Sequence, residues 1–227
     1  MASAKLLNSL IGPVMQRHPN LVFFDTNLFF QPIGWYLRGC MFGKFGWPGG
    51  RTNIIFVYRF VIPLFEPRIR GMIGWGGRLR TRAGSEGWDI DADDFLAEFE
   101  WAFETKIAAR VEAISTGEDL KIYIEKNLDK LSWRERGRAM GCLHTGQLAE
   151  AKKLLETVIK KYKAWSPGDD KETPWITNAR SIIRDIETDP LGLEAKLIAT
   201  VETAENFKIT KFWTQPEKFW DNPPQIP

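Results

Sequence analysis

The feature that most constrains the fold is the run at residues 54–62 (IIFVYRFVI), in which every residue except Arg59 is apolar or aromatic. The run is rich in β-branched and aromatic side chains, which favour strands. A continuous apolar run of this length, followed by Pro63, is typical of a strand that is buried on both faces. We therefore expect these residues to form an interior strand near the middle of a sheet.

The segments around this run predict further strands. Residues 21–24 and 28–33 are apolar and flank the trio Asp25-Thr26-Asn27, which is typical of a tight hairpin turn. Residues 34–45 alternate in polarity and predict a half-buried strand. Residues 68–82 predict a glycine-rich strand. Together with the central run, these segments predict an antiparallel meander of four to five strands.

Helical patterns lie on both sides of the meander in sequence. Residues 2–17 predict a short amphipathic helix that is bent at Gly12-Pro13. Aromatic and aliphatic side chains recur every four residues from Phe95 to Val111, and Asp91 is the expected N-cap of that helix. Further helix starts are expected after Thr116, at the capping box of Ser132 and Glu135, at Leu148, at Thr173-Pro174 and at Asp189-Pro190. The expected fold class is α+β, with an N-terminal helix and a C-terminal helical subdomain of five to six helices.

Charge divides the chain into two parts. Residues 1–85 carry a net charge of +9 and residues 86–227 a net charge of −7. We expect residues 1–86 to form a basic sheet region, and residues 87–227 an acidic helical region with a proline-rich tail whose aromatic side chains pack on the protein. We expect the two parts to make one compact unit. The charges either compensate each other or give the basic part an anionic partner, and both readings stay open.

The cysteines and the hydropathy pattern bear on the compartment. Cys40 and Cys142 are isolated, with no pairing pattern around either, which is typical of a reducing environment. No apolar stretch approaches the length of a membrane span. We therefore expect a soluble cytoplasmic protein without a membrane partner.

Recognisable catalytic patterns are missing from the sequence. His18 and His144 are the two histidines, and each lies at the expected C-terminal end of a helix, where a structural role is the better hypothesis. Two histidines and two separate cysteines give no zinc-ligand spacing and no Ser-His-Asp or Cys-His arrangement. The glycines of residues 71–77 lead into a basic strand, so they do not predict a phosphate-binding turn before a helix. We expect no cofactor and name no catalytic residue.

Four acids match a calcium-binding pattern in part. The first, third, fifth and twelfth positions of an EF-hand loop correspond to Asp89, Asp91, Asp93 and Glu100. The sixth position, which requires glycine, is Asp94, and the expected helix from Phe95 onward would occupy half of the loop. Helix capping accounts for the same acids, so we expect no metal site and keep the EF-hand as a weaker alternative.

A basic and aromatic set of side chains supplies the candidate binding residues. These are Trp35, Arg38, Trp75, Arg78, Arg80 and Arg82. Such a set can stack on bases and bind phosphates, or it can contact a protein. The spacing of Arg78, Arg80 and Arg82 places them on one face of a regular strand, where like charges repel unless they are screened. We expect carboxylates of the C-terminal half of the chain to pair with these arginines.

Two resemblances to known families follow from the order of elements. Gly146, Ala151 and Leu155, within residues 138–159, resemble the turn and second helix of a tetratricopeptide hairpin, although the pattern does not recur. The whole order of a short helix, a meander and several helices resembles uncharacterised bacterial α+β proteins, including the DUF4304-like group and toxin-immunity candidates. That resemblance implies a bacterial protein with an immunity-type role and supplies no catalytic residues.

These observations leave three hypotheses for function. The one we expect is a non-catalytic protein-interaction module, such as an immunity-type inhibitor, whose partner is another protein. The second is a nucleic-acid binder that uses the basic aromatic sheet. The third is an enzyme with an unrecognised carboxylate-based site. If helices cover the basic face of the sheet, the second hypothesis loses its surface.

Overall fold

The computed structural model describes residues 4–44, 53–66, 76–127, 131–165, 174–202 and 212–225. The chain divides into two compact units. Unit 1 comprises Met1–Ile33, Leu37–Ile62 and Met72–Ile114, and unit 2 comprises Gly34–Tyr36, Pro63–Gly71 and Ser115–Pro227. Each unit is described by itself.

Unit 1 is built around β4 (Ile54–Pro63), whose residues are all buried except the first. The sheet order is β1-β2-β3-β4-β5, and β6 also pairs with β4. The other strands are β1 (Leu21–Phe24), β2 (Asn27–Phe30), β3 (Tyr36–Lys44), β5 (Gly76–Arg78) and β6 (Trp88–Asp89). The pairings of β1 with β2, β2 with β3, and β4 with β5 and β6 are antiparallel. The predicted interior strand and the predicted antiparallel sheet are both confirmed.

The first hairpin forms as its turn residues predict. Phe24 lies opposite Asn27, so Asp25 and Thr26 make a two-residue turn. Asp25 has a φ of 57°, a left-handed conformation that aspartate tolerates better than most residues.

Strand β3 differs from its prediction because both of its faces are buried over much of its length. Leu37 and Cys40 have no exposed surface, and Arg38 is 9% exposed. The polar residue of this alternating pattern is Arg38. The Arg38 guanidinium donates to backbone carbonyls instead of facing water. A charged side chain in a strand therefore does not mark a solvent face when carbonyl acceptors surround it.

The predicted glycine-rich strand is described only from residue 76 onward. Residues 67–75 lie outside the described part of the chain. Strand β5 ends at Arg78, and the amide of Gly84 donates to the Thr81 carbonyl oxygen at 3.0 Å, which closes a turn. Arg80 and Arg82 thus lie beyond the strand, and the prediction that they share a strand face with Arg78 is wrong. Gly76 lies so close to β4 that a Cβ atom there would overlap the Arg59 carbonyl oxygen.

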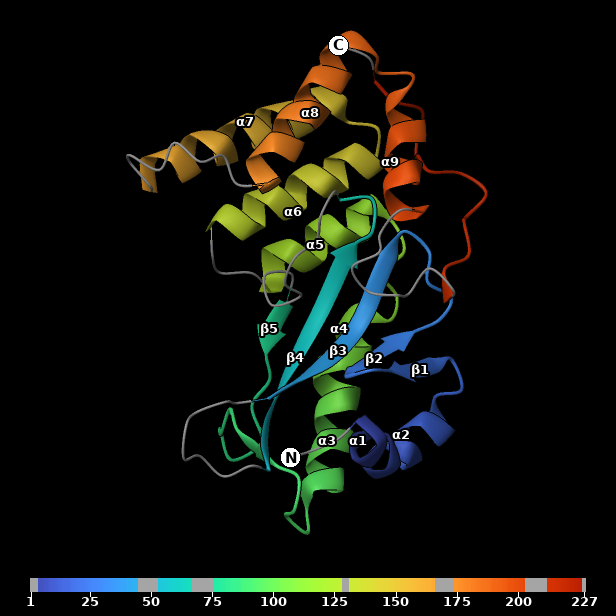
Figure 1. Ribbon diagram of the computed structural model, residues 1–227, viewed down its shortest axis with the longest axis vertical. Coiled ribbons are helices and arrows are strands. Elements are labelled where there is room, and N and C mark those ends of the chain that lie inside the picture. Colours follow the sequence, from blue (N-terminus) through green and yellow to red (C-terminus); the bar gives the residue numbers. More distant parts are fainter. Residues whose placement is uncertain are drawn as a thin grey trace. The chain divides into compact units, whose positions relative to one another are not determined.

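In unit 1 the helices α1 (Ala4–Leu10) and α2 (Gly12–Arg17) lie next to α3 (Phe95–Ala102) (Figure 1). Helix α3 continues into the π-helical segment η2 (Phe103–Ala108) and α4 (Ala109–Val111). The predicted bend of the N-terminal helix is confirmed. Arg17 pairs with Glu100 at 3.0 Å, and the Phe99 ring centroid lies 5.4 Å from that of Phe42. Residues 87–114 therefore pack with the sheet and belong to unit 1, although their composition grouped them with the C-terminal helices.

The N-terminal boundary of α3 corrects another prediction. The helix begins at Phe95 after Asp94, and Asp91 is not its N-cap. The Asp91 amide donates to the Asp89 carboxylate at 3.1 Å, and Asn53 donates to the Asp91 carboxylate. Asp91 is therefore held in the turn before the helix, and its carboxylate is engaged by the chain segment that leads into β4.

Unit 2 contains a series of helices. From α5 to α8, each helix packs against the next one in the chain (Figure 1). They are α5 (Gly117–Asn127), α6 (Leu131–His144), α7 (Leu148–Trp165), α8 (Pro174–Thr188) and α9 (Leu193–Glu202). The predicted C-terminal helical region is confirmed. Near their ends α5 and α6 approach closely, because Gly117 and Gly141 face each other and a Cβ on either would overlap a backbone oxygen of the other.

Two helix starts in unit 2 differ from prediction. Helix α6 already includes Ser132, so the expected capping box does not begin it. Helix α9 begins at Leu193 and not at Pro190. The Asp189 carboxylate accepts a hydrogen bond from the Gly192 amide at 3.0 Å, which holds residues 189–192 in a turn before the helix.

Truncation of the central strand tests its placement. Phe60 has no exposed surface, so Phe60→Ala should lower the free energy of unfolding by about 3 to 5 kcal/mol. Leu191→Ala is the control, because Leu191 is 76% exposed and its truncation should change stability by less than about 0.5 kcal/mol. Urea unfolding followed by tryptophan fluorescence measures both. Equal losses in the two variants would contradict the interior position of Phe60.

Candidate functional site

Two of the predicted binding residues, Trp35 and Arg38, are buried. Trp35 belongs to unit 2, whereas Arg38, Arg78, Arg80 and Arg82 belong to unit 1. Trp75 lies outside the described residues. Trp35 is 4% exposed and its indole nitrogen donates to the Lys218 carbonyl at 2.9 Å, so its ring is not available as a stacking platform.

Arg38 has a structural position. Its guanidinium donates to the carbonyl oxygens of Glu112 at 2.6 Å, Ile114 at 2.9 Å and Pro32 at 2.9 Å. Burial lowers the pKa of Arg38, but an arginine remains charged at neutral pH. A cation is favoured beside the free carbonyls that follow a helix, and Glu112 and Ile114 directly follow α4.

The other three arginines pair with carboxylates, but not with those of the C-terminal half as predicted. Arg78 and Arg80 both contact Glu86, at 2.5 Å and 2.9 Å, and Arg82 contacts Glu98 at 3.4 Å. Hydrogen bonding and charge attraction to Arg78 lower the pKa of Glu86. Both acids belong to unit 1, as the arginines do, so the pairing is within one unit and not between the two halves of the chain. This pairing supports charge compensation within the chain.

Arg78 has aromatic partners as well. Its guanidinium carbon lies 4.2 Å from the centroid of the Phe56 ring, and the guanidinium donates to the Tyr58 hydroxyl at 2.8 Å. The β4–β5 register explains this contact, since Tyr58 lies directly opposite Arg78. The aromatic and basic side chains of this edge therefore satisfy one another.

Three of the four acids of the EF-hand pattern are engaged in separate interactions. Asp89 and Asp91 take part in the turn before α3, and Glu100 on α3 pairs with Arg17. Phe95 to Ala102 is helical, so these residues occupy the second half of the loop as expected, although Asp91 does not cap the helix. Among the described residues, no group of three or more His, Cys, Asp or Glu side chains is placed to hold a metal ion.

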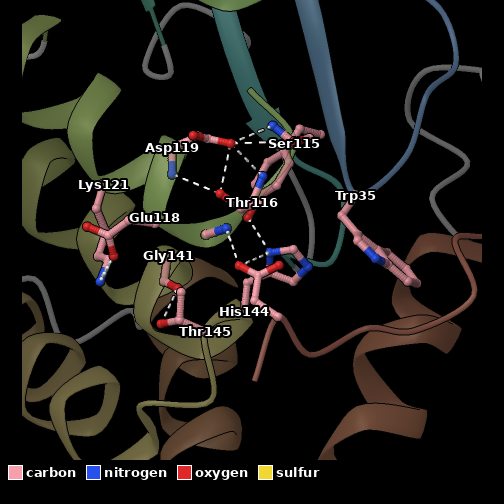
Figure 2. A network of polar contacts seen from close by, with 12 residues as sticks. Trp35, Ser115, Thr116, Glu118, Asp119, Lys121, Gly141, His144 and Thr145 are labelled. Atoms are coloured by element: carbon pink, nitrogen blue, oxygen red, sulfur yellow. Dashed lines mark hydrogen bonds and ion pairs between the residues drawn. The ribbon is translucent and has the colours of Figure 1, made fainter. Parts of the chain in front are cut away.

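A buried polar network in unit 2 was not anticipated from the sequence (Figure 2). The Tyr36 hydroxyl and the Nδ1 atom of His144 share a hydrogen bond of 2.8 Å. Asp221 places a carboxylate oxygen 3.5 Å from the same nitrogen, and that oxygen accepts a hydrogen bond from the Gly117 amide at 2.7 Å. The network joins the start of β3, the end of α6, the start of α5 and the C-terminal segment.

The start of α5 is positioned by a reciprocal cap, which Figure 2 also shows. The Asp119 amide donates to the Thr116 hydroxyl at 3.1 Å, and the Asp119 carboxylate accepts from the Thr116 amide at 3.0 Å and from the Ser115 amide at 3.1 Å. Burial disfavours the charged form of Asp119, but these hydrogen bonds outweigh it and lower its pKa. The cap directs the Gly117 amide toward Asp221.

His144 is held neutral by its surroundings. It is 1% exposed, it stacks on Phe65 with ring centroids 5.6 Å apart, and the Phe219 ring lies 5.3 Å away. Burial lowers the pKa of His144 to about 4. The Phe219 backbone raises the pKa of His144 to a smaller extent. Within the described residues, Nε2 of His144 makes no hydrogen bond of good geometry.

The same burial acts on the partners of His144. Burial, followed by the charges of Asp221 and Asp119, raises the pKa of Tyr36 well above its ordinary value. Burial also raises the pKa of Asp221, against the hydrogen bond from Gly117. Tyr36 and His144 are each 1% exposed, so neither can meet a substrate from solvent. The network therefore satisfies buried polar groups and fastens the C-terminal segment.

An open groove lies elsewhere in unit 2, between α7 and α8. Its volume is about 500 Å³, and it is lined by Ala149, Lys152, Lys153, Glu156, Ile186, Glu187 and Pro190. Ile186 is 1% exposed and belongs to the floor. Lys152 pairs with Glu187 across the groove at 2.7 Å. Leu191, which follows Pro190 in the chain, is 76% exposed.

Comparison of the chain with protein-family models, characterised proteins and solved structures gives no match. The resemblance to the DUF4304-like group and to toxin-immunity candidates therefore stays a prediction. Within the described helices, none combines the length and the apolar character needed to cross a membrane.

The depressed pKa of His144 makes stability depend on pH. The folded state binds the proton less readily than the unfolded state, so this stability is fully present above pH 6.5 and is lost as the pH falls toward about 4. The loss should be on the order of 3 kcal/mol. His144→Gln should flatten the pH dependence of unfolding in this window, while Tyr36→Phe, which keeps the ring buried, should retain it.

Asp221 acts in the opposite direction. Its raised pKa means that the folded state holds the proton more tightly, so its contribution is present below pH 3.8 and is lost as the pH rises. Urea unfolding at a series of pH values measures the sum of the His144 and Asp221 contributions to the free energy of unfolding. If the parent and His144→Gln have the same slope between pH 6.5 and 4, His144 is not held neutral by burial.

The paired arginines predict weak binding to nucleic acids. An electrophoretic mobility shift with single-stranded and duplex DNA and RNA at low salt should show no submicromolar complex, because Glu86 and Glu98 already neutralise these cations. The control is the Glu86→Gln, Glu98→Gln double variant, which should bind more tightly than the parent. Strong, salt-sensitive binding by the parent would favour the nucleic-acid hypothesis.

Proposed function

We propose that the protein is a non-catalytic protein-interaction module, and that it contacts its partner through the α7–α8 surface, defined here as the groove between α7 and α8 together with Leu191. The observation that carries this proposal is the position of Leu191, a large apolar side chain that is 76% exposed beside a groove with a buried apolar floor. An exposed apolar side chain beside a concave surface can supply part of the apolar centre that protein interfaces bury.

The composition of the α7–α8 surface supports a protein as the partner. Protein interfaces combine an apolar centre with a polar rim. Ile186 is buried in the groove, whereas the Lys153 side chain is 76% exposed and pairs with Glu150 at 3.8 Å. Lys152 is held between Glu187 and Glu156. The charged groups of the rim are largely compensated, so the surface offers apolar contact and hydrogen bonding more than net charge.

The remaining candidate residues favour the same class of function. Tyr36 and His144 are buried, so their pairing serves the fold. Arg78, Arg80 and Arg82 are engaged by carboxylates, and a nucleic acid would have to displace these partners. Inhibition of the bound protein, as in toxin-immunity pairs, is one form that this binding can take.

Site-specific cross-linking tests the surface. A photoreactive phenylalanine derivative replaces Leu191, and in a control it replaces Ile122 on α5, which is 44% exposed. Irradiation in cells that produce the protein should give a discrete protein adduct from position 191 and none from position 122. Adducts of the same proteins from both positions would contradict a specific surface.

Reconstitution then measures the contribution of Leu191. Titration calorimetry of the purified partner with the parent protein should show a saturable stoichiometric complex. Leu191→Asp should weaken it by about thirtyfold, which corresponds to the loss of one anchor residue. Ile122→Asp should leave the affinity unchanged. A partner that binds the parent and Leu191→Asp equally does not use the α7–α8 surface.

A further inference from the structure

The C-terminal segment, residues 212–225, is held in unit 2 in the manner of a bound peptide. It forms no helix or strand of its own beyond isolated positions. Its backbone hydrogen bonds therefore go to other parts of unit 2. The Lys218 carbonyl accepts from the Trp35 indole at 2.9 Å, the Asp221 amide donates to the His144 carbonyl at 2.9 Å, and the Gln225 amide donates to the Gly146 carbonyl at 2.8 Å.

Phe219 is the buried anchor of the segment, and Trp213 adds a partly buried contact, because its indole donates to the Gly34 carbonyl at 3.0 Å. Phe219 is 1% exposed, whereas the neighbouring Glu217 and Lys218 are exposed. The Phe219 ring lies edge-on to Trp35 and to Phe65, with centroids 5.1 Å and 5.0 Å apart. A single buried aromatic side chain among exposed neighbours is the pattern of an anchor residue in a peptide complex.

Asp221, two residues after Phe219, has its own binding partners in unit 2. Asp221 accepts a hydrogen bond from the Gly117 amide at the N-terminus of α5, where a negative charge is favoured. The same carboxylate lies 3.5 Å from His144. Phe219 and Asp221 therefore define a recognition pattern of an aromatic residue, any residue and an acid.

The receptor side is shaped to admit a backbone. Gly146 has a φ of 73°, and a Cβ at this position would lie 2.8 Å from the Asn222 carbonyl oxygen and 3.0 Å from that of Pro223. The glycine therefore allows both the turn after α6 and the close approach of residues 222–224. A side chain at this position would displace the segment.

We infer that unit 2 contains a peptide-binding groove, formed by Trp35, Phe65, Gly117, His144 and Gly146, which its own C-terminal segment occupies as a detachable ligand. The partner that fits the groove is an extended peptide with phenylalanine followed two residues later by an acid. Such a peptide from another molecule replaces the C-terminal segment when that segment is released. This inference concerns a different surface from α7–α8 and does not rest on the function proposed above.

Competition by a synthetic peptide tests the inference in the full-length protein. The probe is a fluorescein-labelled peptide with the sequence of residues 212–225, and the measurement is fluorescence anisotropy. Phe219→Ala weakens the internal ligand, so this variant should bind the probe at least about tenfold more tightly than the parent, in which the internal segment competes. A control probe with alanine and asparagine in place of the phenylalanine and aspartate at positions 219 and 221 should not bind.

Equal binding of the two probes, or equal affinity of the parent and Phe219→Ala for the first probe, would overturn the inference. Asp221→Asn serves as a second variant, because it keeps the aromatic anchor and removes only the charge that faces Gly117. If circular dichroism shows that Phe219→Ala is unfolded, the same comparison of parent and Asp221→Asn decides the outcome.

Hydrogen exchange of the unmodified protein gives an independent test. Release of the segment without unfolding requires that the amides of Asp221 and Gln225 exchange faster than the interior amides of α6, such as that of Met140. Exchange of all of these amides at the same slow rate would show that the segment separates only when the unit unfolds, and the groove would then not be available to any other peptide.

Discussion

Two buried arginines on neighbouring strands link the sheet of unit 1 to its long helical segment. Arg38 on β3 donates to the carbonyls of Glu112 and Ile114, and Arg59 on β4 donates to the Lys106 carbonyl at 2.7 Å. A guanidinium moved out of water without acceptors would cost several kcal/mol. The carbonyls that offset this cost lie within the π-helical segment and just after α4. The position of that helical segment is therefore set by charge solvation as well as by apolar contact.

The aromatic side chains supply the apolar part of the same attachment. Phe99 and Phe103 lie one turn apart on the helical segment. Phe99 contacts Phe42 of the sheet, and Phe103 contacts Phe30. The π-helical turn begins at Phe103. Because a π-helical turn inserts an extra residue into the helix, it changes which side chains face the sheet after that point. Lys106, whose carbonyl receives Arg59, lies within this turn.

In unit 2 the C-terminal segment completes the core. Without Phe219 the space between Trp35, Phe65 and His144 would be open to water, and the low pKa of His144 depends on that water being excluded. The segment thus serves the stability of the unit while its contacts retain the form of peptide recognition. A protein-interaction module can use both this groove and the α7–α8 surface, since they involve different residues.

Local patterns in the sequence determined the elements of secondary structure. The apolar run of β4 and the turn at Asp25-Thr26 depend on neighbouring residues, and both elements form as predicted. The four-residue periodicity after Phe95 predicted a helix there, but not its start after Asp94 or its π-helical segment from Phe103. The capping box at Ser132 is not the start of α6, which already begins at Leu131, because the same residue types are compatible with positions inside a helix.

Tertiary structure alone decided the roles of the polar residues. Arginine is usually a surface residue, but Arg38 is buried in the fold. Its guanidinium donates to carbonyls that lie more than 70 residues away in the sequence. The partners Tyr36, His144 and Asp221 are separated by long stretches of chain, and no spacing rule links them. The sequence by itself determined the α+β elements and their order, because hydrophobic periodicity and turn chemistry are local. Whether a given charge meets water, a carbonyl or a carboxylate depends on contacts between distant segments, and those exist only in the folded chain.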